Sequence, residues 1–568
     1  MKVSLYVEDW MMAMGMVGLK RLFEEEVEVT NFGLRFDISI LEQLPERFFK
    51  FMIEEHSIAE RDYKRLKNNL EYAQNKDYFK QNLQQIHQLM SEQFKKVKRY
   101  FAGDPEHEEI SKVIKSVKEI KNIDEIDKLR EAVDRYYTLM KTEKINDKLT
   151  INFLKATIMR SFFGQVSFLN VNKNKLDKQG HIELYYKDYI KPVFLETKFK
   201  ELLNGEDYEA IITYLEDNQD YQPFKSLLEI LKKKSAVQEM RNYMDEEYPQ
   251  CTFIDKQFAT TNYEEMLFSL LGVSKNNSIN FNWDLQKSQP IPLSVLAKLI
   301  LFLAPVGVAF YNRKDGYANQ GEYRVYAGFV LSDEPFPEIV RQNNAFKNKK
   351  QKNDPFNLII YDLLQDIKIK AESVVKQLLF IEIHADYDSK KTLLDYYHMP
   401  AYTAQYFKKY GNKLQHIRQR EYIEAFTRTA LRGIEPKQEV FRYLRTIINS
   451  SSPGVGPFIA VRELNRLQAL KRGAKEMEKE DKKIYVVFRQ GQEIREKLIY
   501  ESEYRSAKAE GDYTASGNKK VNAIAYRLLN AAKAGNKKSF MDTLFRIHMA
   551  AGKEISPIFL NALHEKEL

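Results

Sequence analysis

The sequence predicts an α+β protein with a large, helix-rich N-terminal body followed by a C-terminal helical bundle. Three observations predict this class. Residues 57–142 repeat apolar side chains every three or four positions, which is typical of amphipathic helices. The middle of the chain contains short segments rich in β-branched and aromatic residues, which favour strands. After a Ser-, Pro- and Gly-rich segment at 450–457, helical patterns dominate the rest of the chain.

The length and composition of the chain predict more than one folded unit. Its 568 residues exceed what one hydrophobic core usually serves, and a hydrophobic content of 43% is enough to build several. An aromatic content of 12% argues against extended disorder. A single cysteine excludes a disulfide framework and suits a reducing compartment. Because Glu8 and Asp9 precede the first apolar stretch, where a secretory signal places basic residues, we expect a cytoplasmic protein.

The first half of the chain is predicted to be mainly helical. We interpret the Met-rich segment after Trp10 as a core helix rather than a partner-binding stripe. A long helix is indicated by the repeat of Phe79, Leu83, Ile86, Met90, Phe94, Val97 and Phe101, and Gly103 to Pro105 ends it. The apolar run 299–310 is shorter than the roughly 20 residues that span a bilayer. We therefore expect it to be buried, and we expect no membrane contact.

Strands and a basic loop are predicted in the middle of the chain. The strand-like segments are Val325–Ser332, Phe356–Leu364 and Phe380–Asp388. Between them, residues 345–355 are predicted to form a basic loop, in which Lys347, Lys349 and Lys350 are candidate nucleic-acid contacts. A solvated loop without a ligand explains the same composition equally well.

The last part of the chain is predicted to be a compact basic bundle. Ser450–Pro457 has the composition of a domain joint, so the predicted domains are 1–449 and 458–568. Lys519–Ala534 predicts one helix, which Gly535 and Asn536 end, and Ser539 is the predicted cap of the next. Residues 515–553 contain only one acidic residue, Asp542, and are rich in cations. The candidate polyanion contacts among these cations are Lys519, Lys520, Arg527, Lys533, Lys537, Lys538 and Arg546.

Catalytic signatures are weak throughout the sequence. Glu382, His384, Asp386 and Asp388 share one face of a predicted strand, as a metal-dependent nuclease would require. Their spacing of roughly 7 Å is awkward for one ion, and the polar face of a half-buried strand has the same pattern. The chain contains no phosphate-binding G-x-x-x-x-G-K-[ST] loop and no H-E-x-x-H or G-x-S-x-G motif. We therefore expect no enzymatic activity and no cofactor, and a nuclease is the alternative.

Two further interpretations of the basic and aromatic residues stay open. Aromatic residues between Tyr402 and Tyr422 alternate with lysines and arginines, which suits either base stacking or a helical core. The chain as a whole also fits a stand-alone helical protein whose basic face binds RNA or an acidic partner.

Three segments together resemble the large subunit of the type I-B CRISPR surveillance complex, Cascade. They are YVEDWMMAMGMVGLKRLFEE at 6–25, the segment from LLGVSKNN to LAPVGVAFY at 270–311, and FRYLRTIINSSSPGVGPFIAVREL at 441–464. In that family two C-x-x-C pairs commonly bind zinc, at positions that correspond here to Cys251 with Ile254 and to Ser294 with Ala297. One thiolate cannot complete a tetrahedral zinc site. We therefore expect the family's fold, with a degenerate zinc-finger region at about 251–297.

The resemblance implies a role in antiviral defence. The N-terminal body would dock at the 5′ end of the guide-RNA complex and recognise the protospacer-adjacent motif in duplex DNA. Lys275, Asn276 and Asn277 are candidates for that recognition, since asparagine can pair with an adenine edge, although an Asn-rich turn has the same composition. The C-terminal bundle, similar to the Cascade small subunit, would stabilise the R-loop along its basic face. Expected partners are the CRISPR guide RNA, target double-stranded DNA, other Cascade subunits and a recruited helicase-nuclease.

Overall fold

The structure is a computed structural model that describes residues 1–263, 291–314, 323–350, 378–386, 391–450, 454–474, 477–508 and 517–558. The chain is mostly helical (70%) and its strands form small antiparallel sheets, which confirms the predicted helix-rich α+β class. Within the described ranges, no helix is both long enough and apolar enough to cross a membrane.

A small sheet and a buried helix open the chain. The sheet is antiparallel, has the order β1-β3-β2, and consists of β1 (Lys2–Tyr6), β2 (Glu28–Thr30) and β3 (Gly33–Asp37). Helix α1 (Trp10–Leu22) begins after Asp9, whose carboxylate accepts hydrogen bonds from the backbone N–H groups of Met11 (2.7 Å) and Met12 (3.0 Å). Ten of the 13 residues of α1 are buried, so the Met-rich segment is a core helix, as predicted.

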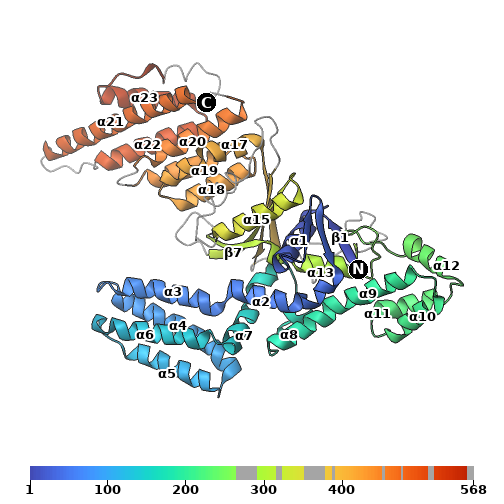
Figure 1. Ribbon diagram of the computed structural model, residues 1–568. Coiled ribbons are helices and arrows are strands. Elements are labelled where there is room, and N and C mark those ends of the chain that lie inside the picture. The colour runs from blue at the N-terminus through green and yellow to red at the C-terminus, as the bar shows by residue number, and fades with distance from the viewer. Residues whose placement is uncertain are drawn as a thin grey trace.

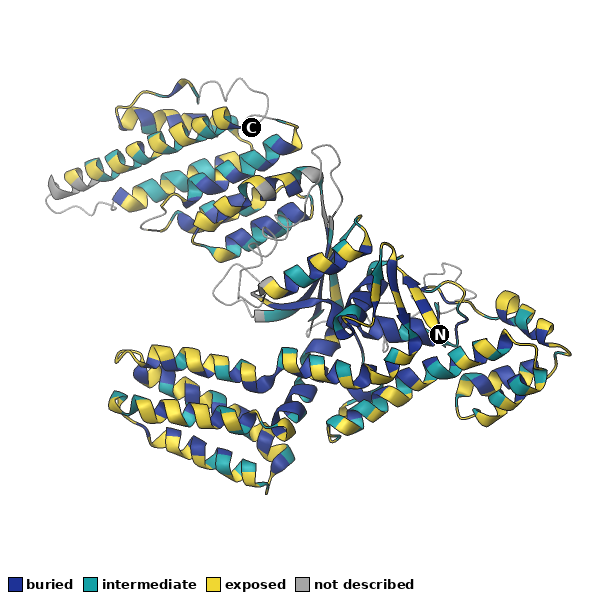
Figure 2. Cartoon of the chain, in the orientation of Figure 1, coloured by how far each residue is buried: buried dark blue, intermediate teal, exposed yellow. Residues whose placement is uncertain are grey.

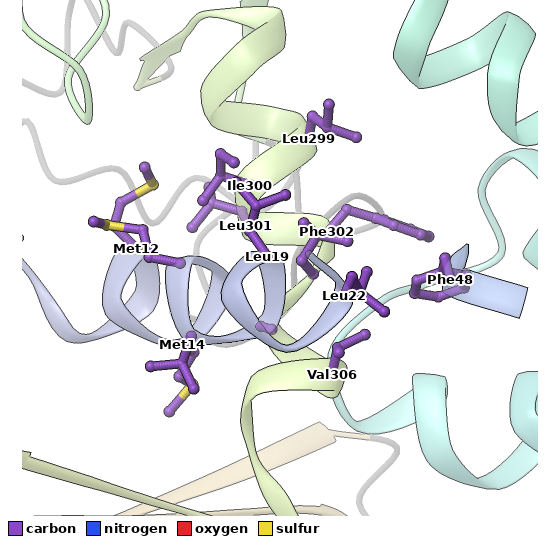
Figure 3. Packing of buried hydrophobic residues seen from close by; sticks show 14 of the residues in the cluster. Met12, Met14, Leu19, Leu22, Phe48, Leu299, Ile300, Leu301, Phe302 and Val306 are labelled. Carbon is purple, nitrogen blue, oxygen red and sulfur yellow. The ribbon is translucent and has the colours of Figure 1, made fainter. Parts of the chain in front are cut away.

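Helix α1 packs tightly against the apolar run, which is buried as predicted. The run 299–310 forms the second half of α13 (Val295–Phe302), all of α14 (Ala304–Gly307) and the start of the strand that follows. A Cβ atom added at Gly15 would lie 2.0 Å from the carbonyl oxygen of Ile300, and one added at Gly307 would lie 1.8 Å from that of Met14. Figure 3 shows the side chains of α1 meeting those of α13 and α14 in this core. Glycine is therefore required where the two backbones meet.

A helical bundle forms between the first sheet and the middle of the chain, as predicted. It contains α2 (Leu44–His56), α3 (Ile58–Ala73), α4 (Phe79–Phe101), α5 (Pro105–Glu119), α6 (Ile126–Met140) and α7 (Glu143–Phe153). Ile86, Met90 and Val97 of α4 are buried in its core, which confirms the helical repeat. Helix α4 ends before Gly103, which has a φ of 92°.

A second group of helices has a hydrophobic cluster of its own. It contains α9 (Lys191–Leu203), α10 (Tyr208–Asp217), α11 (Gln222–Leu231) and α12 (Val237–Asn242), whereas α8 (Lys178–Tyr185) precedes it and contributes Tyr185 to the α1 core. Figure 1 shows this group and the α3–α6 bundle extending in different directions from the α1 core. The short strands β4 (Thr261–Asn262) and β5 (Pro292–Leu293) then pair and lead into α13.

A four-stranded antiparallel sheet joins the α1 core to the last helices. Its strands lie in sequence order: β6 (Ala309–Lys314), β7 (Tyr323–Ser332), β8 (Leu378–Asp386) and β9 (Lys391–Met399), with α15 (Phe336–Lys350) packed beside β6 and β7. Strands β7 and β8 confirm two predicted strands, whereas Phe356–Leu364 lies outside the described residues. Phe329, Ile381 and Ile383 belong to the α1 core, while Phe380 and Tyr397 belong to the cluster shared with the last helices. Alternating side chains thus place one sheet between two cores.

The C-terminal region is helical, as predicted, but it begins before the predicted joint. Its helices are α17 (Ala401–Tyr410), α18 (Arg420–Leu431), α19 (Lys437–Ile447), α20 (Gly456–Lys471), α21 (Glu478–Lys508), α22 (Gly517–Lys533) and α23 (Lys537–Ala550). The segment Ser450–Pro457 runs from the end of α19 into the first residues of α20, inside this region, and residues 451–453 lie outside the described residues. The segment does not separate two cores, because the helices before and after it share one cluster.

Contacts across Ser450–Pro457 are close. A Cβ atom added at Gly456 would lie 2.2 Å from the hydroxyl oxygen of Tyr443 in α19. The Tyr406 hydroxyl of α17 donates to the buried Glu463 carboxylate of α20 (3.2 Å), which also pairs with Arg462 (2.6 Å). Tyr406, like Phe407 and Tyr422, is at most 2% exposed, so the core interpretation holds for these three aromatic residues.

Candidate nucleic-acid interface

Helix α22 presents a cationic face without acidic residues. Its sequence from Gly517 to Lys533 contains no aspartate or glutamate, and only Gly517 and Ala531 are buried. At about 100° per residue, its cations fall within about 140° of the helix circumference. They are Lys519, Lys520, Arg527 and Lys533, and all four are exposed. Asn530, also exposed, lies on the same face and adds a hydrogen-bonding side chain.

The turn after α22 adds two lysines to this surface. Gly535 has a φ of 67° and ends α22 as predicted. The predicted cap of α23 at Ser539 is wrong: the Asn536 side chain is the cap, and it accepts a hydrogen bond from the Ser539 N–H (2.9 Å). The helix therefore begins earlier, and Lys537 and Lys538 lie in its first turn. Lysines beside the positive end of a helix dipole increase the local positive potential.

Other cations at this end of the chain are paired within the protein. Arg546 lies 3.0 Å from the Asp542 carboxylate one turn earlier on α23. Lys553 lies 3.4 Å from Glu493 of α21, an acid that is distant in sequence. These pairs reduce the charge that Arg546 and Lys553 offer to a ligand. The face of α22, together with Lys538, is thus the stronger part of the predicted surface.

The predicted basic loop at 345–355 is wrong in its first half. Residues 345–350 are the last turns of α15, and Lys347 is buried at 8% exposure. Its ammonium lies 3.4 Å from the Glu55 carboxylate and 4.1 Å from the centre of the Phe51 ring. Lys347 therefore joins α15 to α2 and is not available to nucleic acid.

Several predicted contacts lie outside what the structure describes. These are the motif-recognition loop with Lys275, Asn276 and Asn277, and also the side chains of Lys349 and Lys350. Their assignment to nucleic-acid binding stays a prediction.

Glu382 and His384 of β8 are buried, whereas the side chain of Asp386 lies outside the described residues. Glu382 is 1% exposed, and its two carboxylate oxygens accept hydrogen bonds from the hydroxyls of Tyr311 (2.6 Å) and Tyr397 (2.7 Å). The His384 ring lies 4.5 Å from that of Tyr326. Among the described residues, no group of three or more His, Cys, Asp or Glu side chains is arranged to hold a metal ion. Asp388 lies outside these residues.

The segments around Cys251 and Ser294, where a degenerate zinc-finger region was predicted, lie side by side. The Cys251 sulfur accepts hydrogen bonds from the backbone N–H groups of Ser294 (3.2 Å) and Phe253 (3.4 Å). Ser294 in turn caps α13, because its hydroxyl accepts a hydrogen bond from the Ala297 N–H (3.2 Å). Ile254 packs against the α1 core. Hydrogen bonds and apolar contacts thus join the two segments.

Sequence reasoning missed a cationic groove in the N-terminal body. Its lining comes from α2, α4, α7, α8 and the segment between α7 and α8, which are separated by up to about 140 residues. No periodic pattern connects such distant positions. The Asn- and Lys-rich run at 170–175 was the one local signal, since it resembles the composition of a phosphate-contacting loop.

Comparisons with known proteins do not assign a family. No protein-family model matches the sequence, and a search of curated proteins finds no match.

Proposed function

We propose that this chain is the non-catalytic large subunit of a cytoplasmic type I-B CRISPR RNA-guided DNA surveillance complex. The proposal begins from three sequence segments that resemble this family. Two of them, 6–25 and 270–311, meet in the core through Gly15 and Gly307. A chance resemblance in two separate segments would not require those segments to pack together.

One observation carries the proposal most directly, namely the hydrogen bond between the Ser294 N–H and the Cys251 sulfur. The family resemblance pairs these two positions as ligands of one metal, although 43 residues separate them. Zinc ligands lie within about 4 Å of one another, because each is about 2.3 Å from the ion. The contact supports the alignment of this chain with the family at a site where only Cys251 remains of the four cysteines.

The basic face of α22 has a physical role in this proposal. Exposed lysines and arginines attract phosphates through counterion release, whatever the base sequence. Such a surface suits the DNA strand that the guide RNA displaces, since its sequence changes with every target. The face stabilises the R-loop, while guide pairing reads the target sequence.

The N-terminal body has the complementary role. It recognises the protospacer-adjacent motif in duplex DNA, and the Lys275–Asn277 segment is the candidate contact. The assembled complex then recruits a helicase-nuclease, so the chain itself needs no catalytic site.

Co-purification tests the proposal. The chain is expressed with an affinity tag alongside its neighbouring genes, and the bound RNA and proteins are identified together. The expected result is guide RNA of uniform length with the other Cascade subunits. Recovery of the chain free of RNA and subunits would contradict the proposal.

A nuclease assay tests the non-catalytic part separately. The purified chain is incubated with DNA and manganese beside a His384→Ala variant. We expect no cleavage by either protein, because tyrosines occupy both oxygens of Glu382. Cleavage by the parent that His384→Ala abolishes would identify a metal-dependent nuclease instead.

A further inference from the structure

A groove of about 1660 Å³ lies in the N-terminal body, formed by elements other than α22. Its walls are α2, the end of α4, the start of α7, the segment 171–177 and the start of α8. Typical small-molecule pockets measure roughly 300–1,000 Å³. The groove is therefore large enough for a segment of a polymer. Seven basic side chains and four acidic ones line it, and two of the cations, Arg47 and Lys144, pair with acids outside the lining, so the remaining net charge is only slightly positive.

Two of the four acids in the groove are paired with the same lysine of its lining. Lys178 lies 2.9 Å from the Glu143 carboxylate and 3.0 Å from that of Asp147. The Asp177 carboxylate accepts a hydrogen bond from the Gly180 N–H (2.8 Å) at the start of α8. Glu46 is the remaining acid of the lining. Asp177 and Glu46 keep their negative charge, because a neutral N–H donor does not cancel it, so the attraction for an anion comes from the cations that pair with none of these acids.

Three cations of the groove are exposed and make no ion pair within the described ranges: Lys50, Arg99 and Lys175. They come from three separate elements of the lining, namely α2, the last turn of α4 and the segment before α8. Exposed cations from separate walls can each meet a different phosphate of a bound chain.

The walls of the groove are joined by two lysines that are largely covered by the protein. The Lys148 ammonium donates to the Leu176 carbonyl oxygen (2.6 Å) and lies 5.2 Å from the centre of the Tyr100 ring. The Lys155 ammonium donates to the Asn170 carbonyl oxygen (3.1 Å). Burial, with a smaller contribution from Lys148, lowers the pKa of Lys155 to about 8. These bonds fix the irregular segment against α7 and the π-helical turn that follows it (Leu154–Ile158), so the groove is formed before a ligand binds.

The lining combines the groups that recognise single strands. Tyr100 supplies an aromatic ring, and amide side chains such as Asn172 and Gln179 can bond to base edges. Aromatic rings beside cations bind single strands, because unpaired bases can stack while the phosphates meet positive charge. In a duplex the base faces are already stacked and out of reach.

We propose that this groove binds a single-stranded nucleic acid, with its phosphates at Lys50, Arg99 and Lys175 and a base against Tyr100. The binding does not depend on the chain being a Cascade subunit. A failure of the co-purification experiment above would leave it standing, and its own failure would leave the Cascade proposal standing.

A matched pair of triple variants tests the groove. Both are made in a full-length background that carries Lys519→Ala, Lys520→Ala and Arg527→Ala, so that the α22 face does not mask the result. The groove variant adds Lys50→Ala, Arg99→Ala and Lys175→Ala. The control adds Lys115→Ala, Lys118→Ala and Lys121→Ala, which remove the same charge from exposed positions on or beside α5, outside the groove lining.

Fluorescence anisotropy measures the binding of a short labelled oligouridylate RNA, the matching oligothymidylate DNA and a DNA duplex. Losing three phosphate contacts should reduce the slope of log affinity against log salt by about 2. We expect the groove variant to bind a single strand at least about tenfold more weakly at low salt, and the control to change about twofold or less. Thermal unfolding of both variants should match the background, because the changed side chains are exposed.

The three probes separate the outcomes. Loss of both RNA and DNA binding supports recognition of the shared single-stranded backbone, and loss of RNA binding alone supports the same site with contacts to the 2′-hydroxyl. The proposal is overturned if the groove variant and the control bind single strands equally, or if the groove variant loses duplex binding to the same extent as single-strand binding.

Discussion

Helices α1 and α22 differ in how far they are buried in the protein. Ten of the 13 residues of α1 are buried, against two of the 17 residues of α22. Figure 2 shows the same difference, with buried residues concentrated around α1 and exposed ones over α21–α23. Helix α1 is fixed by apolar packing and by backbone contact, while α22 mainly presents charge. The contrast teaches that the two ends of the chain should respond differently to the same kind of substitution.

The outer C-terminal helices also expose large side chains. Tyr500 of α21 is 68% exposed and Met549 of α23 is 80% exposed, whereas the methionines of α1 are at most 5% exposed. Few buried contacts mean a low local opening free energy. We therefore expect amide hydrogens of α21–α23 to exchange faster than those of α1, and the predictions below sharpen this difference.

The largest expected effect is at Gly15 in α1. In Gly15→Ala the new Cβ would meet the Ile300 carbonyl at 2.0 Å, so α1 or α13 must move. Overpacking of this kind costs about 3 kcal/mol or more, because a backbone atom cannot rotate away. Thermal unfolding and the yield of folded protein measure the loss.

Gly491→Ala is the matched substitution in the other region. Gly491 lies inside α21, and a Cβ there would meet nothing within 4 Å. Alanine is the better helix former, so this change should stabilise α21 by about 0.5–1 kcal/mol. Helix propensity favours alanine at both sites, so packing alone distinguishes them. An equal loss of unfolding free energy for Gly15→Ala and Gly491→Ala would therefore contradict the contrast between the two regions.

A pH-dependent effect is expected at Glu196, a buried carboxylate of α9. Burial raises its pKa from 4.5 to about 7, although hydrogen bonds from Thr260 and Tyr221 act in the opposite direction. Between these values the folded protein retains a proton that the unfolded chain has lost. The unfolding free energy therefore falls as the pH rises from about 4.5 through 7, by up to about 3 kcal/mol in total.

Glu196→Gln should remove this dependence. The amide oxygen can still accept the hydrogen bond from the Tyr221 hydroxyl, which is 2.6 Å long in the parent. The variant should match the parent at about pH 4.5 and exceed its stability at about pH 8, as thermal unfolding at the two values would measure. Asp542→Asn on exposed α23 is the control, with an expected change below about 0.5 kcal/mol at either pH. Parallel pH profiles for parent and Glu196→Gln would show that Glu196 ionises normally in the fold.

Periodic patterns predicted the fold well where burial follows local sequence. The α4 repeat was found because one side of that helix faces a core, and β7 and β8 were found because strands buried on both faces are rich in apolar and aromatic residues. The start of the C-terminal helical region was not found, because Ser450–Pro457 looks like a joint although Tyr443 packs directly on Gly456. A Ser-, Gly- and Pro-rich composition predicts where a helix ends. It does not report whether the helices on either side share a core.

Charge was predicted less well than fold, because pairing is a tertiary property. Lys347 looked like a loop lysine, yet it is buried against Glu55 and Phe51. Arg546 and Lys553 are paired with acids, and the acid that pairs with Lys553 is distant in sequence. The α22 cations were identified correctly as exposed, since a helix without acids has no local partner to offer them. The groove around Lys50, Arg99 and Lys175 was missed because its walls meet only in the folded chain.

The smallest effect on stability is expected for substitutions of the exposed α22 cations, which should instead weaken nucleic-acid binding. Lys519→Ala, Lys520→Ala and Arg527→Ala together remove three exposed cations from α22, and alanine keeps or improves helix propensity. The unfolding free energy should change by less than about 0.5 kcal/mol. Nucleic-acid affinity should fall for every sequence alike, and the slope of log affinity against log salt should become smaller by about 2 to 3. A change in sequence preference would mean that these side chains contact bases as well as phosphates. A loss of stability like that of Gly15→Ala would mean that they also hold α22 in place, which would contradict the contrast between a packed α1 and a charged α22.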